Sequence, residues 1–361
     1  MATPTLTLRQ VAQQANVSVA TVSYVLSGKG RMAPETRRKV ERLLREAGIR
    51  PRHKRYPVFY LCDHREFRDM QACNPFLQLY DGLNASFHQA EITLRVEFLH
   101  KPGAGGLRGQ LEQLHAARVG GVILDSNLRD DVEHVGRFFE QQKVPAVQVG
   151  HAVRAPGIDA VVVDNFGGAH GAVRHLIDRG HTRIATIRWN VGGDPASSKK
   201  YAGYTCALNE AGLPIRPQYV VESPFTKEDH VLPGRVAIER LLSLDEPPTA
   251  VFVENSFISP GLIYPSDATE RQLPEPIAAL DIVHFEAWHL EWVEQVMAGK
   301  LNYPPRRTKL LRINWEELGH VAAKRLLTRM ESDQQGGEVI QVVPRLIQVE
   351  GYESTPLEVT R

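Results

Sequence analysis

The first part of the chain takes its fold from the stretch TLRQVAQQANVSVATVSYVLSG, residues 7–28. Thr7 can cap a helix whose apolar residues share one face at helical spacing: Leu8, Val11, Ala12 and Ala15. Asn16 follows this helix, and asparagine tolerates the left-handed backbone conformation that a sharp turn requires. The stretch therefore predicts a short helix that ends in a tight turn.

Two more helices are predicted after this turn. Ser18 can cap the first of them, which runs from Val19 to Leu26, with Val19, Val22 and Leu26 facing inward and Ala20, Thr21 and Tyr24 facing away. The other begins at Pro34, a residue favoured in the first helical turn, and ends before Gly48. Its inward side is expected to carry Val40, Leu43, Leu44 and Ala47.

Charge separates a DNA-binding helix-turn-helix from an ordinary three-helix bundle with the same apolar face. Residues 1–56 contain twelve Lys and Arg but three acidic residues, so this part carries +9. The rest of the chain carries −8, although the whole chain is close to neutral at +1. A basic head on an acidic body indicates a polyanionic partner for the head alone, which favours the helix-turn-helix.

The second helix is expected to enter the major groove of double-stranded DNA. Hydroxyl side chains at its start suit phosphates, and the side chains of Val19, Ala20 and Tyr24 suit base edges. Basic residues of the following loop and linker complete the predicted DNA contacts. These are Thr7, Ser18, Val19, Ala20, Thr21, Ser23, Tyr24, Lys29, Arg31, Arg52, Lys54 and Arg55.

Residues 7–28, together with Pro34-Glu35-Thr36-Arg37, resemble the headpiece of the LacI/GalR family of repressors. The resemblance is dense over about thirty residues. It implies a transcriptional regulator, of the repressor type, that acts as a homodimer and sets two recognition helices on a near-palindromic operator. Some family members carry a base-reading Arg where this chain has Tyr24, so their operator sequence does not transfer.

The joint after the third helix departs from the family. Gly48-Ile49-Arg50-Pro51 matches the family's approach to a hinge helix, whose Leu inserts into the minor groove. Here only six residues, 52–57, separate Pro51 from the first predicted strand of the body. Our hypothesis is that the Leu wedge is missing and that Arg52, Lys54 and Arg55 contact phosphates or the minor groove instead. A solvated basic linker is the open alternative.

From Val58 onward, short apolar strands alternate with amphipathic helices, which is typical of parallel βαβ architecture. The expected strands include Val58–Cys62, Leu94–Phe98, Gly121–Asp125, Ala146–Val149, Arg183–Arg188, Ala250–Glu254 and Ile277–Asp281. The expected helices include Phe76–Gln89, Leu107–Ala117 and Ala169–Arg179. Open sheets of this kind bind ligands at the carboxyl ends of their strands.

Short segments of the body also resemble the LacI/GalR family, among them Asn74-Pro75-Phe76, residues 161–165, residues 175–185 and Pro344-Arg345-Leu346-Ile347. The implied fold class is an all-α helix-turn-helix headpiece plus an α/β body of two doubly wound parallel-sheet subdomains, like periplasmic binding proteins. We expect the headpiece at 1–50, a short basic linker at 51–57 and an effector-binding body at 58–361. Its N-subdomain is expected at about 58–163 and 284–330, and its C-subdomain at about 164–283 and 331–361.

Three positions of the implied cleft depart from the family. Lys200 stands where an Arg is common and lacks its bidentate fork, Ser256 stands where the family has an Asp, and Val283 replaces a ligand-binding Asp. We therefore expect a small-molecule effector that is sugar-like or anionic, held by aromatic rings and a cation. The candidate residues, several of which also suit plain core or surface positions, are Phe76, Asp125, Ser126, His151, Asp194, Lys200, Phe225 and Asn255.

Other functions find little support in the sequence. The glycine-rich run at 103–109 has Arg108 where a dinucleotide loop needs its third glycine, and Asp281, His284 and Glu286 lack a second cluster with zinc spacing. We expect neither an enzyme nor a cofactor or metal. The first residues show no signal-peptide pattern, no apolar run approaches a membrane span, and three cysteines form no evident framework, so we expect a cytoplasmic protein.

Two alternatives stay open beside a regulator controlled by an effector. The chain can be a constitutive DNA-binding regulator without an effector. It can also be a stand-alone small-molecule binding protein, but that class needs a signal peptide and has no use for a +9 head. The sequence does not decide between a repressor and an activator, or between a dimer and a tetramer.

Overall fold

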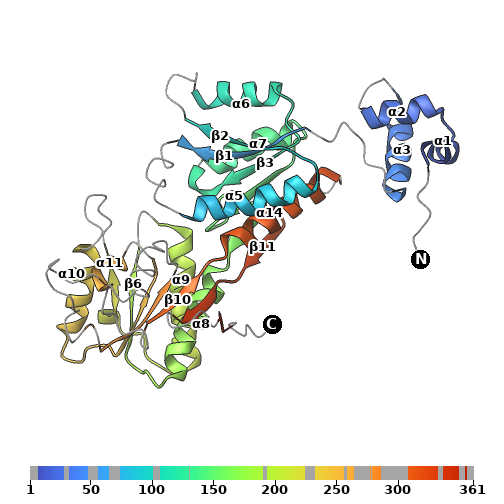
Figure 1. The fold of residues 1–361 in the computed structure, drawn as a ribbon. Helices are drawn as coiled ribbons and strands as arrows, with labels where there is room; N and C mark the ends of the chain where they lie inside the picture. The colour runs from blue at the N-terminus through green and yellow to red at the C-terminus, as the bar shows by residue number, and fades with distance from the viewer. Residues whose placement is uncertain are drawn as a thin grey trace.

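The computed structural model describes residues 7–27, 32–47, 56–64, 74–100, 106–129, 131–189, 193–223, 232–255, 258–263, 277, 279–285, 308–331, 336–348 and 354–355. These residues form a helical headpiece and an α/β body with two separate sheets (Figure 1). None of the helices in this described part combines the length and the hydropathy needed to span a bilayer.

The headpiece consists of α1 (Leu8–Ala15), α2 (Val19–Ser27) and α3 (Pro34–Glu46). The predicted cap is confirmed, because Thr7 Oγ1 accepts from the Gln10 amide at 3.4 Å and Gln10 Oε1 accepts from the Thr7 amide at 2.7 Å. Asn16 has the left-handed conformation with φ 57°, as the turn requires. The start and the turn of the helix-turn-helix therefore follow from residues that the sequence names.

A small core of its own holds the headpiece together. Its buried members are Val11, Ala12, Ala15, Val22, Val25, Val40, Leu43, Leu44 and Ala47. The prediction that Val19 points inward is wrong: its side chain is 44% exposed, and Val25 is fully buried instead. Helical side chains tilt toward the N-terminus, so the first residue of α2 directs its side chain over the turn rather than toward α1 and α3.

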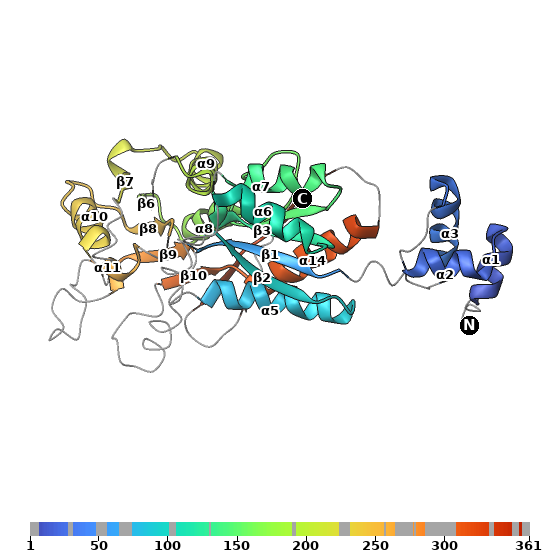
Figure 2. The same ribbon diagram turned by 90° about the horizontal axis from the view of Figure 1, so that it is seen from above.

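The first subdomain of the body is built on a fully parallel sheet in the order β11-β5-β4-β3-β1-β2. Its strands are β1 (Val58–Asp63), β2 (Leu94–Leu99), β3 (Gly121–Asp125), β4 (Ala146–Gly150), β5 (Asp159–Val163) and β11 (Val339–Val342). Helices α5 (Asn74–Gln89) and α14 (Trp315–Glu331) pack on one face, and α6 (Gly106–Ala116) and α7 (Asp131–Gln141) pack on the other. Seen from above, α5 and α6 lie on opposite sides of β1 and β2 (Figure 2).

The second subdomain is built on the sheet β13-β12-β10-β9-β8-β6-β7. Its strands are β6 (Ile184–Arg188), β7 (Val220–Glu222), β8 (Ala250–Val253), β9 (Asp281–Phe285), β10 (Thr308–Arg312), β12 (Arg345–Gln348) and β13 (Ser354–Thr355). Among the described strands of this sheet, β12 pairs antiparallel with both of its neighbours, β10 and β13, and the other pairings are parallel. Helices α8 (Asn165–Asp178) and α9 (Pro195–Glu210) cover one face, and α10 (Leu232–Leu242) and α11 (Pro260–Ile263) cover the other. Two short 3-10 helices complete the described elements: η2 (Ser126–Leu128) and η3 (Pro217–Tyr219).

The sequence located six of the seven strands it named to within one or two residues, but it was wrong for Ile277–Asp281. The strand there is β9, which begins at Asp281, and Ile277 is buried before it. The pairing of Asp281 with Ala250 fixes this register, since it places Ile282 and Val283 beside Val251 and Phe252 in the middle of the sheet. An apolar residue before a strand cannot be told from one within it by hydropathy alone.

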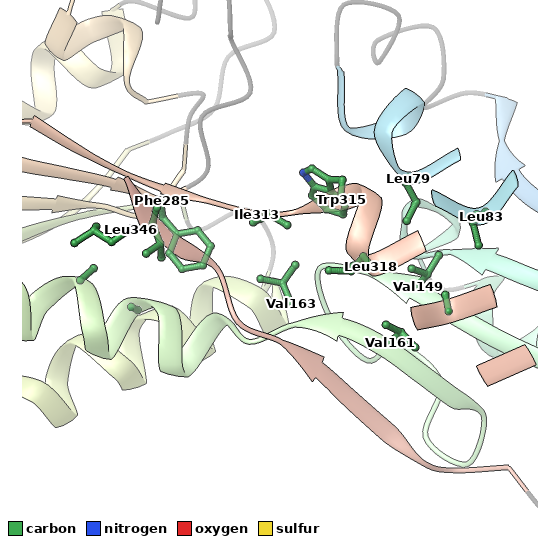
Figure 3. Packing of buried hydrophobic residues seen from close by; sticks show 14 of the residues in the cluster. Leu79, Leu83, Val149, Val161, Val163, Phe285, Ile313, Trp315, Leu318 and Leu346 are labelled. Atoms are coloured by element: carbon green, nitrogen blue, oxygen red, sulfur yellow. The ribbon is translucent and has the colours of Figure 1, made fainter. Parts of the chain in front are cut away.

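The chain crosses between the two subdomains between β5 and α8, between β10 and α14, and between β11 and β12. The expected assignment of 284–330 to the N-subdomain is therefore wrong for β10, and that of 331–361 to the C-subdomain is wrong for β11. Buried apolar side chains line these crossings, where Val163, Ile313 and Trp315 belong to a core that continues into both subdomains (Figure 3). β11 is an edge strand and β10 lies inside its sheet, and in both cases the pairing partner is set by tertiary packing rather than by neighbouring sequence.

Candidate DNA interface and inter-subdomain site

The second helix presents an uncharged, exposed face. Tyr24 is 53% exposed and Val19 is 44% exposed, and Ala20 and Ser23 are also exposed. The residues predicted to face base edges are therefore accessible, whereas Lys29, Arg31, Arg52, Lys54 and Arg55 lie outside the described residues.

The start of α2 has a hydroxyl pair. Ser18 Oγ accepts a hydrogen bond from the Thr21 amide at 3.0 Å, and the two hydroxyl oxygens lie 2.8 Å apart. No acidic residue stands in the first turn of α2, so the partial positive charge of the helix N-terminus is not offset there. Amides and hydroxyls at such an end suit an anion such as a phosphate. Thr7, by contrast, is occupied as the cap of α1.

On the first subdomain, carboxyl ends of parallel strands carry an acid and an aromatic stack. The Tyr60 hydroxyl donates to Asp125 Oδ2, and Asp125 Oδ1 accepts from the Asn127 amide at 2.8 Å. Burial raises the pKa of Asp125, against the opposing effect of these hydrogen bonds. The ring of Phe76 stacks on the ring of Tyr60, with 5.6 Å between the ring centroids and 17° between the planes. Phe76 thus stacks on a neighbouring ring, and Asp125 is fixed in place by a tyrosine that sequence reasoning did not select.

The next strand end holds Ser126 and His151 together. The His151 amide donates to Ser126 Oγ at 3.4 Å, and Gly150 permits this approach, because an added Cβ would lie 2.1 Å from that oxygen. The imidazole ring of His151 packs edge-on against the Trp315 ring, with 4.9 Å between the ring centroids and 75° between the planes. Burial, together with the smaller effect of the charges of Lys200 and Arg154, lowers the pKa of His151 to about 3. His151 is therefore neutral at physiological pH, and it lies close enough to sense a cation of the second subdomain.

That cation, Lys200, is buried in the second subdomain at 3% exposure. Its Nζ donates to the Glu254 carbonyl at 2.9 Å and lies 4.1 Å from the centre of the Phe285 ring. Backbone and ring contacts thus fix Lys200 beside the buried Glu254, whose carboxylate its charge also stabilises.

Glu254 organises the surroundings of Lys200. It is fully buried after β8, where its carboxylate accepts from Ser197 Oγ at 2.6 Å and from Arg188 Nε at 3.3 Å. Burial raises the pKa of Glu254, and the Ser197 hydrogen bond and the charges of Lys200 and Arg188 oppose that rise. The Arg188 guanidinium also lies over the Tyr201 ring at 4.3 Å. The result is a buried acid that fixes one serine and one guanidinium beside the lysine.

An ion pair beside this site joins the two subdomains directly. Arg154, from the segment between β4 and β5, donates from Nη2 to Asp194 Oδ1 at 3.1 Å, and both side chains are 25% exposed. Asp194 also caps α9 by accepting from the Ser197 amide. Arg154 Nε is buried and has no hydrogen-bond partner among the described residues. We call the surroundings of His151, Arg154, Asp194 and Lys200 the inter-subdomain site.

The structure brings most of the predicted effector residues into this neighbourhood. Ser126 contacts His151, Asp194 pairs with Arg154, and Asn255 directly follows Glu254. Phe225 lies outside the described residues. Sequence reasoning missed Tyr60, Arg154, Arg188 and Glu254. For Arg188 and Glu254 the sequence did hold a signal, because both residues stand at the ends of predicted strands, where such sheets bind ligands.

Two residues once considered as metal ligands have other roles. Asp281 Oδ2 accepts from Arg179 Nε at 2.9 Å and lies 2.8 Å from His181 Nε2. His284 is fully buried and shares a hydrogen bond with Ser259 through Nδ1 at 2.8 Å. Both side chains thus serve the packing of the second sheet, and Glu286 lies outside the described residues.

Comparison with known proteins places these features in context. Residues 7–52 match the family described as "Bacterial regulatory proteins, lacI family", and residues 70–273 match "Periplasmic binding proteins and sugar binding domain of LacI family". Catabolite control protein A of Priestia megaterium is 28% identical over 356 residues, which cover 94% of this chain and 97% of that protein. The HTH-type transcriptional repressor CytR of Escherichia coli (strain K12) is 27% identical over 286 residues, covering 76% of this chain and 79% of CytR.

Two solved structures share the fold over nearly the whole chain. A complex of the transcriptional regulator CelR with cellobiose aligns with a TM-score of 0.61 and 23% identity, covering 96% of this chain and all of that one. The lac repressor dimer bound to operator and the anti-inducer ONPF aligns with a TM-score of 0.58 and 20% identity, covering 98% of this chain and 99% of that one. At this level of identity, the likeness establishes the common fold of headpiece and two-subdomain body.

Proposed function

The chain belongs to the LacI family of bacterial regulatory proteins, and from this premise we propose how its parts carry out regulation. Members of the family are DNA-binding transcriptional regulators, not enzymes, and their body is an effector-binding domain. We infer that this protein is a repressor of the cytoplasm whose affinity for its operator is set by a small molecule bound at the inter-subdomain site. The observation that carries this proposal is the meeting of His151, Arg154, Asp194 and Lys200 between the subdomains.

The DNA side of the proposal rests on α2. We assign base-edge contacts to Val19, Ala20 and Tyr24, which are exposed, and phosphate contacts to Ser18 and Thr21 at the helix start. Two such helices in a homodimer would fit half-sites about 34–36 Å apart, one turn of DNA, on a near-palindromic operator. The basic residues Arg52, Lys54 and Arg55 add phosphate or minor-groove contacts near the centre of that operator.

The effector side rests on the mixture of rings and cations. Phe76 on Tyr60 offers an aromatic stack, Lys200 supplies a buried positive charge, and the buried Arg154 Nε has a donor hydrogen to satisfy. A ligand with acceptor oxygens, such as a sugar-like or anionic metabolite, matches these donors. An apolar ligand does not, because it would leave the Arg154 donor without a partner.

Coupling follows from the three crossings between the subdomains. A ligand that contacts both subdomains favours the arrangement in which they are close, and it shifts the population only as far as it binds that arrangement better. A change in that arrangement alters the spacing of the two headpieces in a dimer, and therefore their joint fit to two half-sites. The six residues between Pro51 and Val58 leave little chain to absorb the change.

The experiment is a comparison of DNA affinity with and without metabolites. Compounds that raise the thermal unfolding temperature of the wild type are selected first, and the affinity for an operator fragment is then measured at physiological salt with each. The proposal predicts that at least one stabilising sugar or anionic metabolite changes this affinity about fivefold or more. If none of the stabilising compounds changes it, the constitutive alternative holds and effector control is withdrawn.

A further inference from the structure

Helices α8 and α9 pack unusually closely at one point on the outer side of the second sheet. Gly203 makes this approach possible, because an added Cβ would lie 2.4 Å from the Phe166 carbonyl oxygen and 2.9 Å from the His170 amide nitrogen. His170 on α8 therefore stands directly opposite the stretch of α9 that follows Gly203. Residues 203, 206 and 210 lie on one face of α9, since they are three, four and seven positions apart.

Three side chains with metal-binding atoms converge at this point. His170 Nε2 lies 2.8 Å from Glu210 Oε2, and Cys206 Sγ lies 3.5 Å from Glu210 Oε1. All three ligand atoms lie within 4.8 Å of one another. The side chains of His170 and Glu210 are 27% and 52% exposed, and Cys206 is half-buried, so an ion from solvent can reach them. None of the three belongs to the inter-subdomain site or the headpiece.

We propose that His170, Cys206 and Glu210 form a divalent metal site of the zinc class on the surface between α8 and α9. A thiolate, an imidazole and a carboxylate are the ligand types that Zn²⁺ prefers, and water would fill the fourth position. Ligand atoms around a tetrahedral zinc lie roughly 3.3–3.8 Å apart, given Zn–ligand distances of about 2.0–2.3 Å. The three atoms reach this spacing by small side-chain rotations. The thiol proton is released to solvent when the ion binds.

The surroundings support a histidine held in one orientation. The Phe166 ring lies nearly parallel to the His170 ring, at 14° and with 6.1 Å between the ring centroids, so it limits the movement of the imidazole on that side. The cysteine and the glutamate stand four residues apart on α9, and the histidine comes from a different helix. Binding would therefore join two helices by a cross-link that packing alone does not supply.

The test uses the full chain without an affinity tag, freed of metal by a chelator, with Zn²⁺ and Co²⁺ as the probes. We expect one Zn²⁺ per chain in a competition titration against a chromophoric chelator, and a thiolate-to-cobalt charge-transfer band with Co²⁺. Cys206→Ser and His170→Gln should each weaken Zn²⁺ binding by at least about tenfold, as the loss of even an outer partner of a metal ligand does. Cys206→Ser should also abolish the charge-transfer band.

The matched control is Cys73→Ser, which removes a thiol outside the three-residue cluster. It should leave both the stoichiometry and the charge-transfer band unchanged. Glu210→Gln is an exposed substitution that serves as a second variant if either of the others unfolds. The proposal is overturned if the wild type binds no Zn²⁺, or if it binds Zn²⁺ no more tightly than Cys206→Ser does.

Discussion

Arg154 of the first subdomain and Asp194 of the second form an ion pair over 3.1 Å, and Asp194 at the same time caps α9. The pair lies beside Lys200, the buried cation of the inter-subdomain site, whose charge also acts on His151. A contact between subdomains is thus attached to the helix that carries the main candidate for effector binding. Movement of one subdomain against the other would break or re-form the ion pair between Arg154 and Asp194.

The two roles of Asp194 can be separated by substitution. Asp194→Asn keeps the cap of α9, since asparagine caps helices as well as aspartate, but it loses the ion pair. Because both partners are partly exposed, we expect a loss of no more than about 1 kcal/mol in the free energy of unfolding. Asp194→Ala loses the cap as well and should cost about 1 kcal/mol more. Denaturant unfolding of the two variants measures the difference, and equal losses would show that the cap contributes nothing.

Lys200 is the residue on which effector binding should depend most. Lys200→Met keeps most of the buried volume and removes the charge, so the affinity for an oxygen-rich effector should fall at least about tenfold, as expected for a lost charged hydrogen bond. Lys199→Met is the matched control, because Lys199 is its neighbour on α9 but is exposed. Isothermal titration with the effector gives both affinities. A similar affinity in the two variants would remove Lys200 from the site.

His284 predicts a pH dependence of stability. Burial lowers the pKa of His284 to about 3, so the folded protein keeps it neutral while the unfolded chain protonates it below about 6.5. The stabilisation that comes from keeping His284 neutral in the folded state is therefore complete above pH 6.5. It is lost as the pH falls toward 3. Between pH 6.5 and 5, His284→Gln should reduce the slope of unfolding free energy against pH by up to about 1.4 kcal/mol per pH unit. Parallel curves for variant and wild type would contradict this.

Tyr24 tests the assignment of α2 to the major groove. Its side chain is 53% exposed and outside the headpiece core, so Tyr24→Ala should leave the unfolding temperature unchanged. Loss of a base contact should weaken operator binding by about 1–3 kcal/mol, while binding to unrelated DNA stays the same. Gln14→Ala, an exposed substitution on α1, is the control. An equal loss on operator and unrelated DNA would mean that Tyr24 contacts only the backbone.

The sequence predicted the headpiece well because local rules govern it. The cap at Thr7, the left-handed Asn16 and the inward side of α3 follow from residues a few positions apart. The exception was Val19, whose exposure depends on how a helix start projects beyond its neighbours. Strand positions in the body were also accessible, since buried parallel strands are short apolar runs.

The connections between subdomains were harder to predict from the sequence, because strand pairing joins segments far apart in the chain and leaves no local sequence pattern. β11 follows α14 in the chain, but it pairs with β5 of the first sheet. β10 comes just before α14, which packs on the first sheet, yet β10 itself pairs with β9 of the second sheet. For the same reason the sequence selected Asp194 and Lys200 but not Arg154 or Glu254, which meet them only in the folded chain. Charged residues at strand ends are common, and only three-dimensional contacts show which of them converge.

The central claim is specific, regulated DNA binding, and selection of genomic DNA fragments by the purified protein at physiological salt tests it most directly. We predict enrichment of one near-palindromic sequence whose half-sites are centred about one helical turn apart. Neighbouring genes would then indicate the effector. Binding that depends on salt but enriches no sequence, with or without stabilising metabolites, would contradict the account, since it would reduce the headpiece to a nonspecific polyanion binder.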